Sequence, residues 1–327
     1  MKRASLIFVA AISCRIAAAQ AAEPLEQVAT VTLPNVAGRI DHLAFDAAHQ
    51  RLFVAALGNG TVEVLDAESN AHLRTLAGFH EPQGIAVAAN FGAVAVANGD
   101  TGTLQLLDAE TFATRWTVDI GGDADNVRYH AAEKQLYVAA IGGLYRVDPG
   151  TGKVAGKIAI DGHPESFQLE ANGKRAFANL PGVLSSQVVV SDRERAEALV
   201  RWSSLGCRSN YPMALDEMTS RVLIGCRMPA RLVMLDARSG GMLTSVEIVG
   251  DTDDLFFDAS RQRIYVIGGE GYVDVFQRSG DELDRTARVA TRAGARTGLW
   301  VASVSKLYVA VPARDGQPAE VRVFEAE

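Results

Sequence analysis

The chain has 327 residues, of which 48% are hydrophobic and 22% are charged, and its formal net charge is −7. A chain of this length can form two domains or one large all-β domain, and its charged fraction argues against long disordered tails. An acidic chain without a clustered basic face cannot neutralise a phosphate backbone, which excludes nucleic acid as a partner.

The first 21 residues have the pattern of a secretory signal peptide. Lys2 and Arg3 give a positive start, residues 6–12 are a short apolar run, and an A-x-A cleavage signal ends at Ala21. The run is too short to span a bilayer, and no later segment has the length and apolarity of a transmembrane helix. We therefore expect residues 1–21 to be removed and the mature chain to be exported to a bacterial periplasm.

One short strand-like sequence, which we call the phrase, occurs seven times in the rest of the chain. Equivalent positions in successive copies are 40 to 46 residues apart. A period in the low forties with only β-strand signals is typical of the four-stranded blades of a β-propeller. The phrases occupy residues 40–46, 82–88, 124–130, 164–170, 210–216, 252–258 and 296–302.

Each phrase predicts the first strand of a blade, and the residues after it predict the others. A second strand rich in Val, Ile, Leu and Tyr follows, as in residues 52–55 and 136–139. It is apolar on both faces, because stacked blades bury both faces of a middle strand. A third strand and a more polar outer strand such as residues 72–76 complete the repeat, and polar side chains on that outer edge oppose pairing with other chains.

The last repeat has only three strand signals, at residues 297–302, 307–311 and 320–324. A spare strand at residues 27–33 precedes the first repeat and can supply the missing fourth strand. The sequence therefore predicts an all-β fold: a seven-bladed β-propeller of four-stranded antiparallel blades, closed by the N-terminal strand. We expect residues 22–327 to form this one domain.

Three pairs of segments carry a resemblance to a known group of proteins. They are residues 210–216 with 225–227, 250–254 with 268–271, and 294–297 with 311–314. The repeats resemble the YncE-like (YVTN-repeat) exported bacterial β-propellers, within the cytochrome d1/surface-layer propeller superfamily, over essentially the whole mature chain. The resemblance implies an exported seven-bladed propeller and gives no specific activity. Cytochrome d1 relatives hold a haem in the channel, but this chain has no C-x-x-C-H motif for covalent haem.

Propellers place ligands at one mouth of the central channel, where the inner strands begin and the loops between second and third strands lie. At the second position of the seven phrases, four of the seven residues are carboxylates. These positions are Asp41, Gln83, Asp125, Glu165, Tyr211, Asp253 and Thr297.

Converging carboxylates beside histidines suit a divalent cation. Ca²⁺ would take Asp41, Asp125, Glu165 and Asp253 with water, whereas a transition metal would recruit His42, His80 or His163. Of these residues we take Asp41, Glu165 and Asp253 as the candidate metal ligands. His42 and His163 are the candidates for moving protons in catalysis. The alternative is a purely structural role, in which the carboxylates cap backbone N–H groups of neighbouring blades and His42 is a satisfied polar residue.

Arginines in the predicted mouth loops indicate a different ligand. Guanidinium groups bind carboxylate or phosphate at two points, although they also pair with neighbouring acids. A mixed arginine and aspartate mouth fits a polar organic ligand or a peptide segment better than a bare cation. The candidate ligand-binding residues are Arg39, Asp41, His42, Asp125, Glu165, Asn210, Arg227, Asp253 and Arg296.

Two functional hypotheses follow. The first is a periplasmic binding or interaction protein, a monomer that takes a small polar ligand or a periplasmic protein or peptide at the mouth. The second is a metal-assisted hydrolase or lyase that acts on a lactone or similar small substrate through the acidic ring. Separately, Cys207 and Cys226 fall within one predicted blade, and both a disulfide and a pair of buried thiols fit the sequence.

Overall fold

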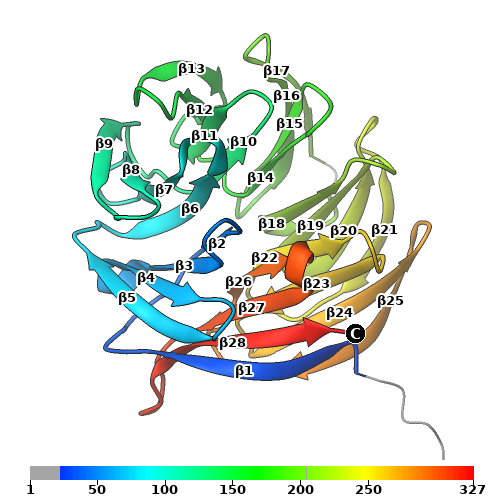
Figure 1. The fold of residues 1–327 in the computed structure, drawn as a ribbon. Coiled ribbons are helices and arrows are strands. Elements are labelled where there is room, and N and C mark those ends of the chain that lie inside the picture. The colour runs from blue at the N-terminus through cyan, green and yellow to red at the C-terminus, as the bar shows by residue number, and fades with distance from the viewer. Residues whose placement is uncertain (1–22, 204) are drawn as a thin grey trace, which may run out of the picture.

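The computed structural model describes residues 23–203 and 205–327, so the predicted signal peptide lies outside the described residues. These residues form 28 β-strands and three short 3-10 turns, Leu57–Asn59, Ala89–Phe91 and Ala302–Val304. The strands build seven four-stranded antiparallel sheets arranged in a ring (Figure 1). In this described part of the chain, no helix has the length and apolarity needed to cross a membrane. The seven-bladed propeller predicted from the sequence is confirmed.

The first four blades each run from an inner strand at the ring centre to an outer strand at its rim. Blade 1 contains β2 (Leu43–Asp46), β3 (Arg51–Ala56), β4 (Thr61–Asp66) and β5 (Ala71–Ala77). Blade 2 contains β6 (Pro82–Ala88), β7 (Ala93–Asn98), β8 (Thr103–Asp108) and β9 (Thr114–Asp119). Blade 3 contains β10 (Val127–His130), β11 (Gln135–Ala140), β12 (Gly143–Val147) and β13 (Val154–Ala159). Blade 4 contains β14 (Phe167–Leu169), β15 (Arg175–Leu180), β16 (Gln187–Asp192) and β17 (Glu197–Trp202).

Blades 5 and 6 have the same order, and blade 7 takes its outer strand from the N-terminal segment. Blade 5 contains β18 (Arg208–Asp216), β19 (Arg221–Met228), β20 (Ala230–Asp236) and β21 (Met242–Glu247). Blade 6 contains β22 (Thr252–Asp258), β23 (Arg263–Gly268), β24 (Tyr272–Ser279) and β25 (Glu282–Ala290). Blade 7 contains β26 (Thr297–Val301), β27 (Lys306–Val311), β28 (Ala319–Ala326) and β1 (Leu25–Leu33).

The ring is closed by the pairing of β1 with β28. The two strands run antiparallel with Val31 opposite Val321, and the order of the sheet is β1-β28-β27-β26. Figure 1 shows this as the blue first strand lying along the red last strand. The closing strand predicted at residues 27–33 is confirmed, and it begins two residues earlier than expected.

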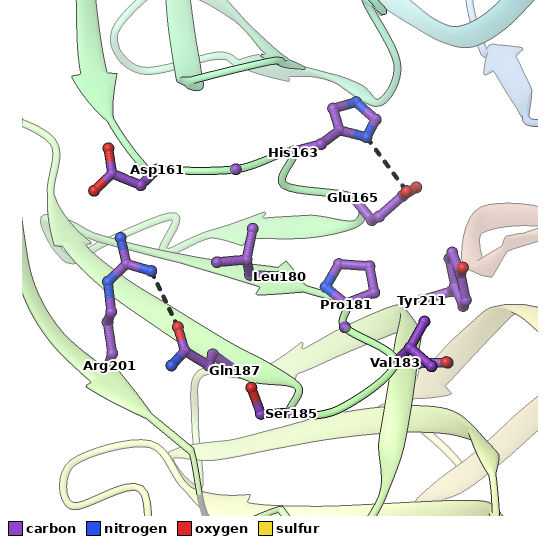
Figure 2. Close-up of a pocket in the computed structure, with 13 residues that line it drawn as sticks. Asp161, His163, Glu165, Leu180, Pro181, Val183, Ser185, Gln187, Arg201 and Tyr211 are labelled. Carbon is purple, nitrogen blue, oxygen red and sulfur yellow. Dashed lines mark hydrogen bonds and ion pairs between the residues drawn. The ribbon is translucent and has the colours of Figure 1, made fainter.

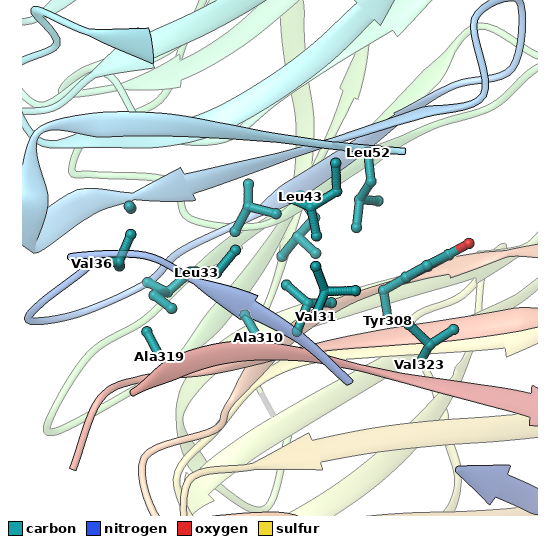
Figure 3. Packing of buried hydrophobic residues seen from close by; sticks show 14 of the residues in the cluster. Val31, Leu33, Val36, Leu43, Leu52, Tyr308, Ala310, Ala319 and Val323 are labelled. Atoms are coloured by element: carbon teal, nitrogen blue, oxygen red, sulfur yellow. The ribbon is translucent and has the colours of Figure 1, made fainter. Parts of the chain in front are cut away.

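The core consists of layers between neighbouring blades. Strand β3 illustrates this, because its side chains alternate between two layers and none of them is exposed: Leu52 and Val54 pack toward blade 7, whereas Phe53 packs toward blade 2. Figure 3 shows the layer between blades 7 and 1, where Leu33 of β1 and Tyr308 of β27 meet the blade 1 side chains. Burial on both faces explains why the second strands lack strict apolar–polar alternation.

Cys207 and Cys226 form a disulfide within blade 5, with their Cα atoms 6.0 Å apart. Both residues are buried in the layer that blade 5 shares with blade 4. Of the two alternatives open at the sequence level, the structure has the disulfide.

We predict that Leu33→Ala, at the closing strand, lowers the free energy of unfolding by about 2–5 kcal/mol, because it removes a side chain that is 1% exposed and leaves a cavity in the layer between blades 7 and 1. Val28→Ala is the matched control on the same strand, since Val28 is 44% exposed. Urea unfolding of both variants measures the difference. Equal losses would show that the strand does not depend on this layer.

Candidate functional site

A polar cavity of about 430 Å³ opens where the inner strands begin. We call it the mouth cavity. All seven blades contribute to its wall, which follows from the ring geometry because each inner strand starts at the same end of the channel. It is lined by Arg39, His42, Leu57, Glu81, Gln83, Asp123, Asp125, His163, Glu165, Tyr211, Arg227, Asp253 and Arg296.

A repeated β-bulge positions the lining residues of several blades. In blade 1, Asp41 N donates to the carbonyl of Ala55 at 2.8 Å, and Ala55 N donates to the carbonyl of His42 at 3.1 Å, so two residues oppose one. Such a bulge breaks the regular alternation and redirects side chains, here at the start of the strand. The same pair of bonds recurs at Asp125 and Asn126 in blade 3 and at Glu165 and Ser166 in blade 4. Regular pairing in these blades consequently begins later than the sequence phrases suggest, at Leu43, Val127 and Phe167.

One side of the mouth cavity is acidic. Blades 2, 3 and 4 contribute Glu81, Asp123, Asp125 and Glu165, which we call the acidic arc. Burial raises the pKa of Asp125 well above its ordinary value, and the adjacent carboxylates of Glu165 and Asp41 raise it further. Burial also acts to raise the pKa of Glu165, but hydrogen bonds from His163 and Asp125 outweigh it and lower that pKa. Asp125 and Glu165 therefore form a pair in which Asp125 holds the proton more tightly.

His163 adjoins this pair. Its Nε2 lies 3.2 Å from the carbonyl oxygen of Asp123, and its Nδ1 lies 3.4 Å from Glu165 Oε1. Burial lowers the pKa of His163, but the hydrogen bond and charge of Glu165 outweigh burial and raise it. One donor atom each from Asp125, His163 and Glu165 lies within 4.8 Å of the others, a grouping that could hold a metal ion. The three predicted metal ligands are not grouped in this way, since Glu165 alone belongs to the cluster, and Asp41 and Asp253 face arginines.

The opposite side of the mouth cavity carries Arg39, Arg227 and Arg296, from blades 1, 5 and 7, which we call the arginine arc. They surround Asp253 of blade 6. Arg227 Nη2 donates to Asp253 Oδ1 at 2.7 Å, Arg296 Nε lies 3.6 Å from Asp253 Oδ2, and Arg39 Nη2 lies 3.9 Å from the same oxygen. Burial raises the pKa of Asp253 to about 6, although Arg227 and Arg39 act to lower it.

Arg227 is held in place by Tyr211, Thr252 and Asp253, and its Nε also lies 3.4 Å from Asp251 Oδ1. Its guanidinium lies over the ring of Tyr211, 3.9 Å from the ring centroid, and its Nε donates to the carbonyl of Thr252 at 3.0 Å. With Asp253 as the third partner, the side chain is fixed while its Nη1 group hydrogen-bonds no residue in the described part of the chain. A cation–π contact and two hydrogen bonds thus orient donors toward the cavity before any ligand is present.

The floor of the mouth cavity is a polar bridge across the ring centre. His42 of blade 1 places Nδ1 3.3 Å from Asp254 Oδ2 of blade 6 and Nε2 2.9 Å from the side-chain amide of Asn126 of blade 3. Burial would lower the pKa of His42, but the carboxylates of Asp254, Asp41 and Asp125 outweigh it and raise the pKa to about 10. At neutral pH His42 is therefore an imidazolium that joins three blades, and both of its N–H groups need acceptors. Nδ1 has Asp254, and Nε2 requires Oδ1 of the Asn126 amide, which otherwise is a buried oxygen without a hydrogen-bond partner among the described residues.

The structure brings most of the predicted ligand-binding residues together. Seven of the nine line the mouth cavity, namely Arg39, His42, Asp125, Glu165, Arg227, Asp253 and Arg296. Asp41 does not line it, because it is buried behind Arg39, whose Nη2 donates to Asp41 Oδ2 at 2.9 Å. Asn210 does not line it either: its amide donates to Asn179 Oδ1 and to the carbonyl of Gln187, both at 2.9 Å, and joins blade 5 to blade 4.

Sequence reasoning missed a second cavity of about 510 Å³, which we call the side groove (Figure 2). It lies over blade 4 and shares His163, Glu165 and Tyr211 with the mouth cavity. The long β15–β16 loop, residues 181–186, forms one wall. The sequence does contain a signal for this long loop, because the interval between the phrases of blades 4 and 5 is the longest of the six intervals between successive phrases. The other lining residues are Asp161, Gly162, Leu180, Pro181, Gly182, Val183, Ser185, Gln187, Arg201 and Ser209.

Comparison with solved structures supports the fold. No family model matches the chain, and no curated protein matches it. The chain is similar to one in the structure titled "Kuenenia stuttgartiensis Hydrazine Synthase", with a TM-score of 0.76 and 15% identity over 86% of this chain and 94% of that one. It is also similar to a chain in the structure titled "Crystal Structure of Mitotic Checkpoint Complex", with a TM-score of 0.76 and 12% identity over 97% and 99%. At these identities the likeness shows the propeller fold alone. Membership of the YncE-like group stays a prediction.

We predict that His42→Gln lowers the free energy of unfolding at neutral pH by about 3 kcal/mol, since it leaves the buried Asp254 carboxylate without its cationic partner. The raised pKa of His42 adds a pH signature. Its stabilisation is complete below about 6.5, the pKa in an unfolded chain, and is lost as pH rises through about 10. The free energy of unfolding, measured with denaturant across this pH range, should fall with rising pH in the wild type and change less in His42→Gln.

His80→Gln is the control, because His80 is exposed at the rim. It should retain the wild-type dependence on pH. An identical slope in the wild type and in His42→Gln would contradict the assignment of His42 as a buried imidazolium.

Proposed function

We propose that the protein is an exported binding protein that holds a small polar organic ligand in the mouth cavity. The observation that carries this proposal is the division of charge within one cavity, with an acidic arc from blades 2 to 4 and an arginine arc from blades 5, 7 and 1. A volume of about 430 Å³ lies within the usual range for small-molecule sites. The ligand that fits has an anionic group at one end and a hydrogen-bond donor at the other, as in an amino acid or a hydroxy acid.

The arginine arc suits an anionic group because its members are fixed but not fully used. Arg296 Nη1 donates to both oxygens of Asp251, at 3.0 and 3.2 Å, and Arg227 is held by Tyr211 and Asp253. Side chains that are already ordered lose little conformational freedom when a ligand binds. Because burial raises the pKa of Asp253 to about 6, its carboxylate takes up a proton more easily than an ordinary aspartate when an anion enters.

The acidic arc suits the other end of the ligand. Asp125 and Glu165 lie side by side, and carboxylate oxygens can accept hydrogen bonds from an ammonium or hydroxyl group. A protein partner is less well matched, because protein interfaces are centred on apolar anchors and this cavity is almost entirely polar.

Export to the periplasm is part of the proposal. It rests on the signal-peptide pattern of residues 1–21 and on the disulfide between Cys207 and Cys226, since such bonds persist in oxidising compartments and are rare in the cytosol.

We predict that Arg227→Gln weakens binding of the ligand about 10- to 100-fold, because it removes a charge-assisted hydrogen bond worth about 1.5–3 kcal/mol. A thermal-shift panel of amino acids, hydroxy acids, dicarboxylates and sugar acids identifies the ligand, and titration calorimetry measures the affinity. Arg195→Gln is the control, since Arg195 lies in an exposed turn of blade 4 away from the cavity. If no compound stabilises the wild type, or if Arg227→Gln binds as tightly as the control, the proposal is wrong.

We also predict that binding of an anionic ligand strengthens as pH falls through about 6. Protonation of Asp253 in that range removes the negative charge that competes for Arg227 and Arg296. Asp253→Asn should bind more tightly than the wild type at neutral pH and lose this dependence. The titration needs a ligand whose own acid group ionises well below this range, and the same pH profile in both proteins would contradict the prediction.

A further inference from the structure

We infer that Asp125, His163 and Glu165 form a binding site for one divalent first-row transition-metal ion, with Zn²⁺ as the representative ion. The three side chains come from two neighbouring blades, and one donor atom of each lies within 4.8 Å of the others. The site lies where the mouth cavity meets the side groove, since His163 and Glu165 line both. It goes beyond the proposed organic-ligand function and does not depend on it.

The first argument is the orientation of His163. Its Nε2 lies 3.2 Å from the backbone carbonyl of Asp123, and a carbonyl can only accept, so Nε2 carries a proton. The other ring nitrogen, Nδ1, faces Glu165 Oε1 at 3.4 Å (Figure 2). Two acceptors that face each other require a cation or a proton between them. Histidines that bind metals commonly donate their second N–H to a backbone carbonyl, as His163 does to Asp123.

The second argument is the environment of Asp125. The residue is 4% exposed, and its carboxyl group lies beside that of Glu165, with which it shares a hydrogen bond. Two buried carboxyl groups this close need a proton or a cation between them, and a bound metal ion supplies the cation. Asp41 differs, because it accepts a hydrogen bond from Arg39.

The donor set selects the class of ion. Zn²⁺ binds imidazole nitrogen and carboxylate oxygen, and in sites that remain open it takes three protein ligands and leaves one position for water or another group. Ca²⁺ requires six to eight oxygen atoms, which one histidine and two carboxylates do not supply. The fourth position would face cavities of about 430 and 510 Å³, which have room for water or for a donor group of a ligand.

A shared proton is the competing explanation for the same contacts, and Asp125→Asn separates the two. Asparagine has the shape of a protonated aspartic acid, so this variant keeps a hydrogen bond to Glu165 but cannot supply an anionic ligand. If the cluster is a metal site, Asp125→Asn should melt at the same temperature as the chelator-treated wild type and should bind Zn²⁺ at least about tenfold more weakly than the wild type. If the contacts instead reflect a shared proton, the wild type itself should bind no Zn²⁺.

The experiment is calorimetric titration of chelator-treated, untagged mature protein with ZnCl₂ and, separately, CaCl₂. We expect one Zn²⁺ per chain, a raised melting temperature, and no comparable effect of Ca²⁺. His163→Gln and Glu165→Gln should lose Zn²⁺ binding as Asp125→Asn does, and with Co²⁺ as a probe His163→Gln should change the visible absorption spectrum. Asp161→Asn, an acid of the side groove outside the cluster, is the control.

Three results would overturn the inference: no Zn²⁺ binding by the wild type, unchanged binding by the three cluster variants, or Ca²⁺ binding as tight as Zn²⁺ binding. Arg227→Gln should bind Zn²⁺ like the wild type, because it lies in the arginine arc and not in the cluster. Failure of the metal site is thereby distinguished from failure of the organic-ligand proposal, which is tested by the arginine variant with organic compounds alone.

Discussion

The pairing of β1 with β28 is the constraint on which the rest of the structure depends. A middle strand such as β3 buries both faces only when a blade lies on each side of it, so every blade needs two neighbours. Blade 7 obtains its outer strand from the other end of the chain, and this ties it to blade 1. A closed ring also brings all seven inner strands to one mouth. The mouth cavity, to which every blade contributes, therefore exists only because the chain closes on itself.

Within the ring, the backbone supplies positions and the side chains supply the differences. Blades 1, 3 and 4 share the same bulge at the start of the inner strand, yet the second residue of the bulge is His42, Asn126 and Ser166 in turn. A shared bulge with varied side chains lets one repeated unit build an asymmetric site. The division of charge arises in this way, because carboxylates accumulate on blades 2 to 4, whereas the arginines lie on blades 5, 7 and 1 around Asp253 of blade 6.

The period of the repeats was sufficient to predict the fold, the number of blades and the closing strand, because burial between blades dictates the same apolar pattern in each copy. Alignment of the copies also predicted which positions meet at the mouth. It did not predict which of them touch. The candidate metal ligands lie on blades 1, 4 and 6, namely Asp41, Glu165 and Asp253. The two carboxyl groups that form a pair, those of Asp125 and Glu165, lie on the adjacent blades 3 and 4. Asn210 is a candidate ligand-binding residue in the sequence, but its side chain turns toward blade 4, whereas that of its neighbour Tyr211 lines the cavity.

The floor of the cavity limits what the mouth can do. His42 links blades 1, 3 and 6 through Asn126 and Asp254, and the amide of Gly298 on blade 7 also donates to Asp254, at 2.9 Å. Four blades are thus held together by one buried cation and its carboxylate, directly beneath the arginine and acidic arcs. A charged bridge at this depth resists displacement by a polar solute, because separating His42 from Asp254 leaves each charge buried and unpaired. A ligand of the proposed kind would therefore be expected to enter and leave on the side of the two arcs.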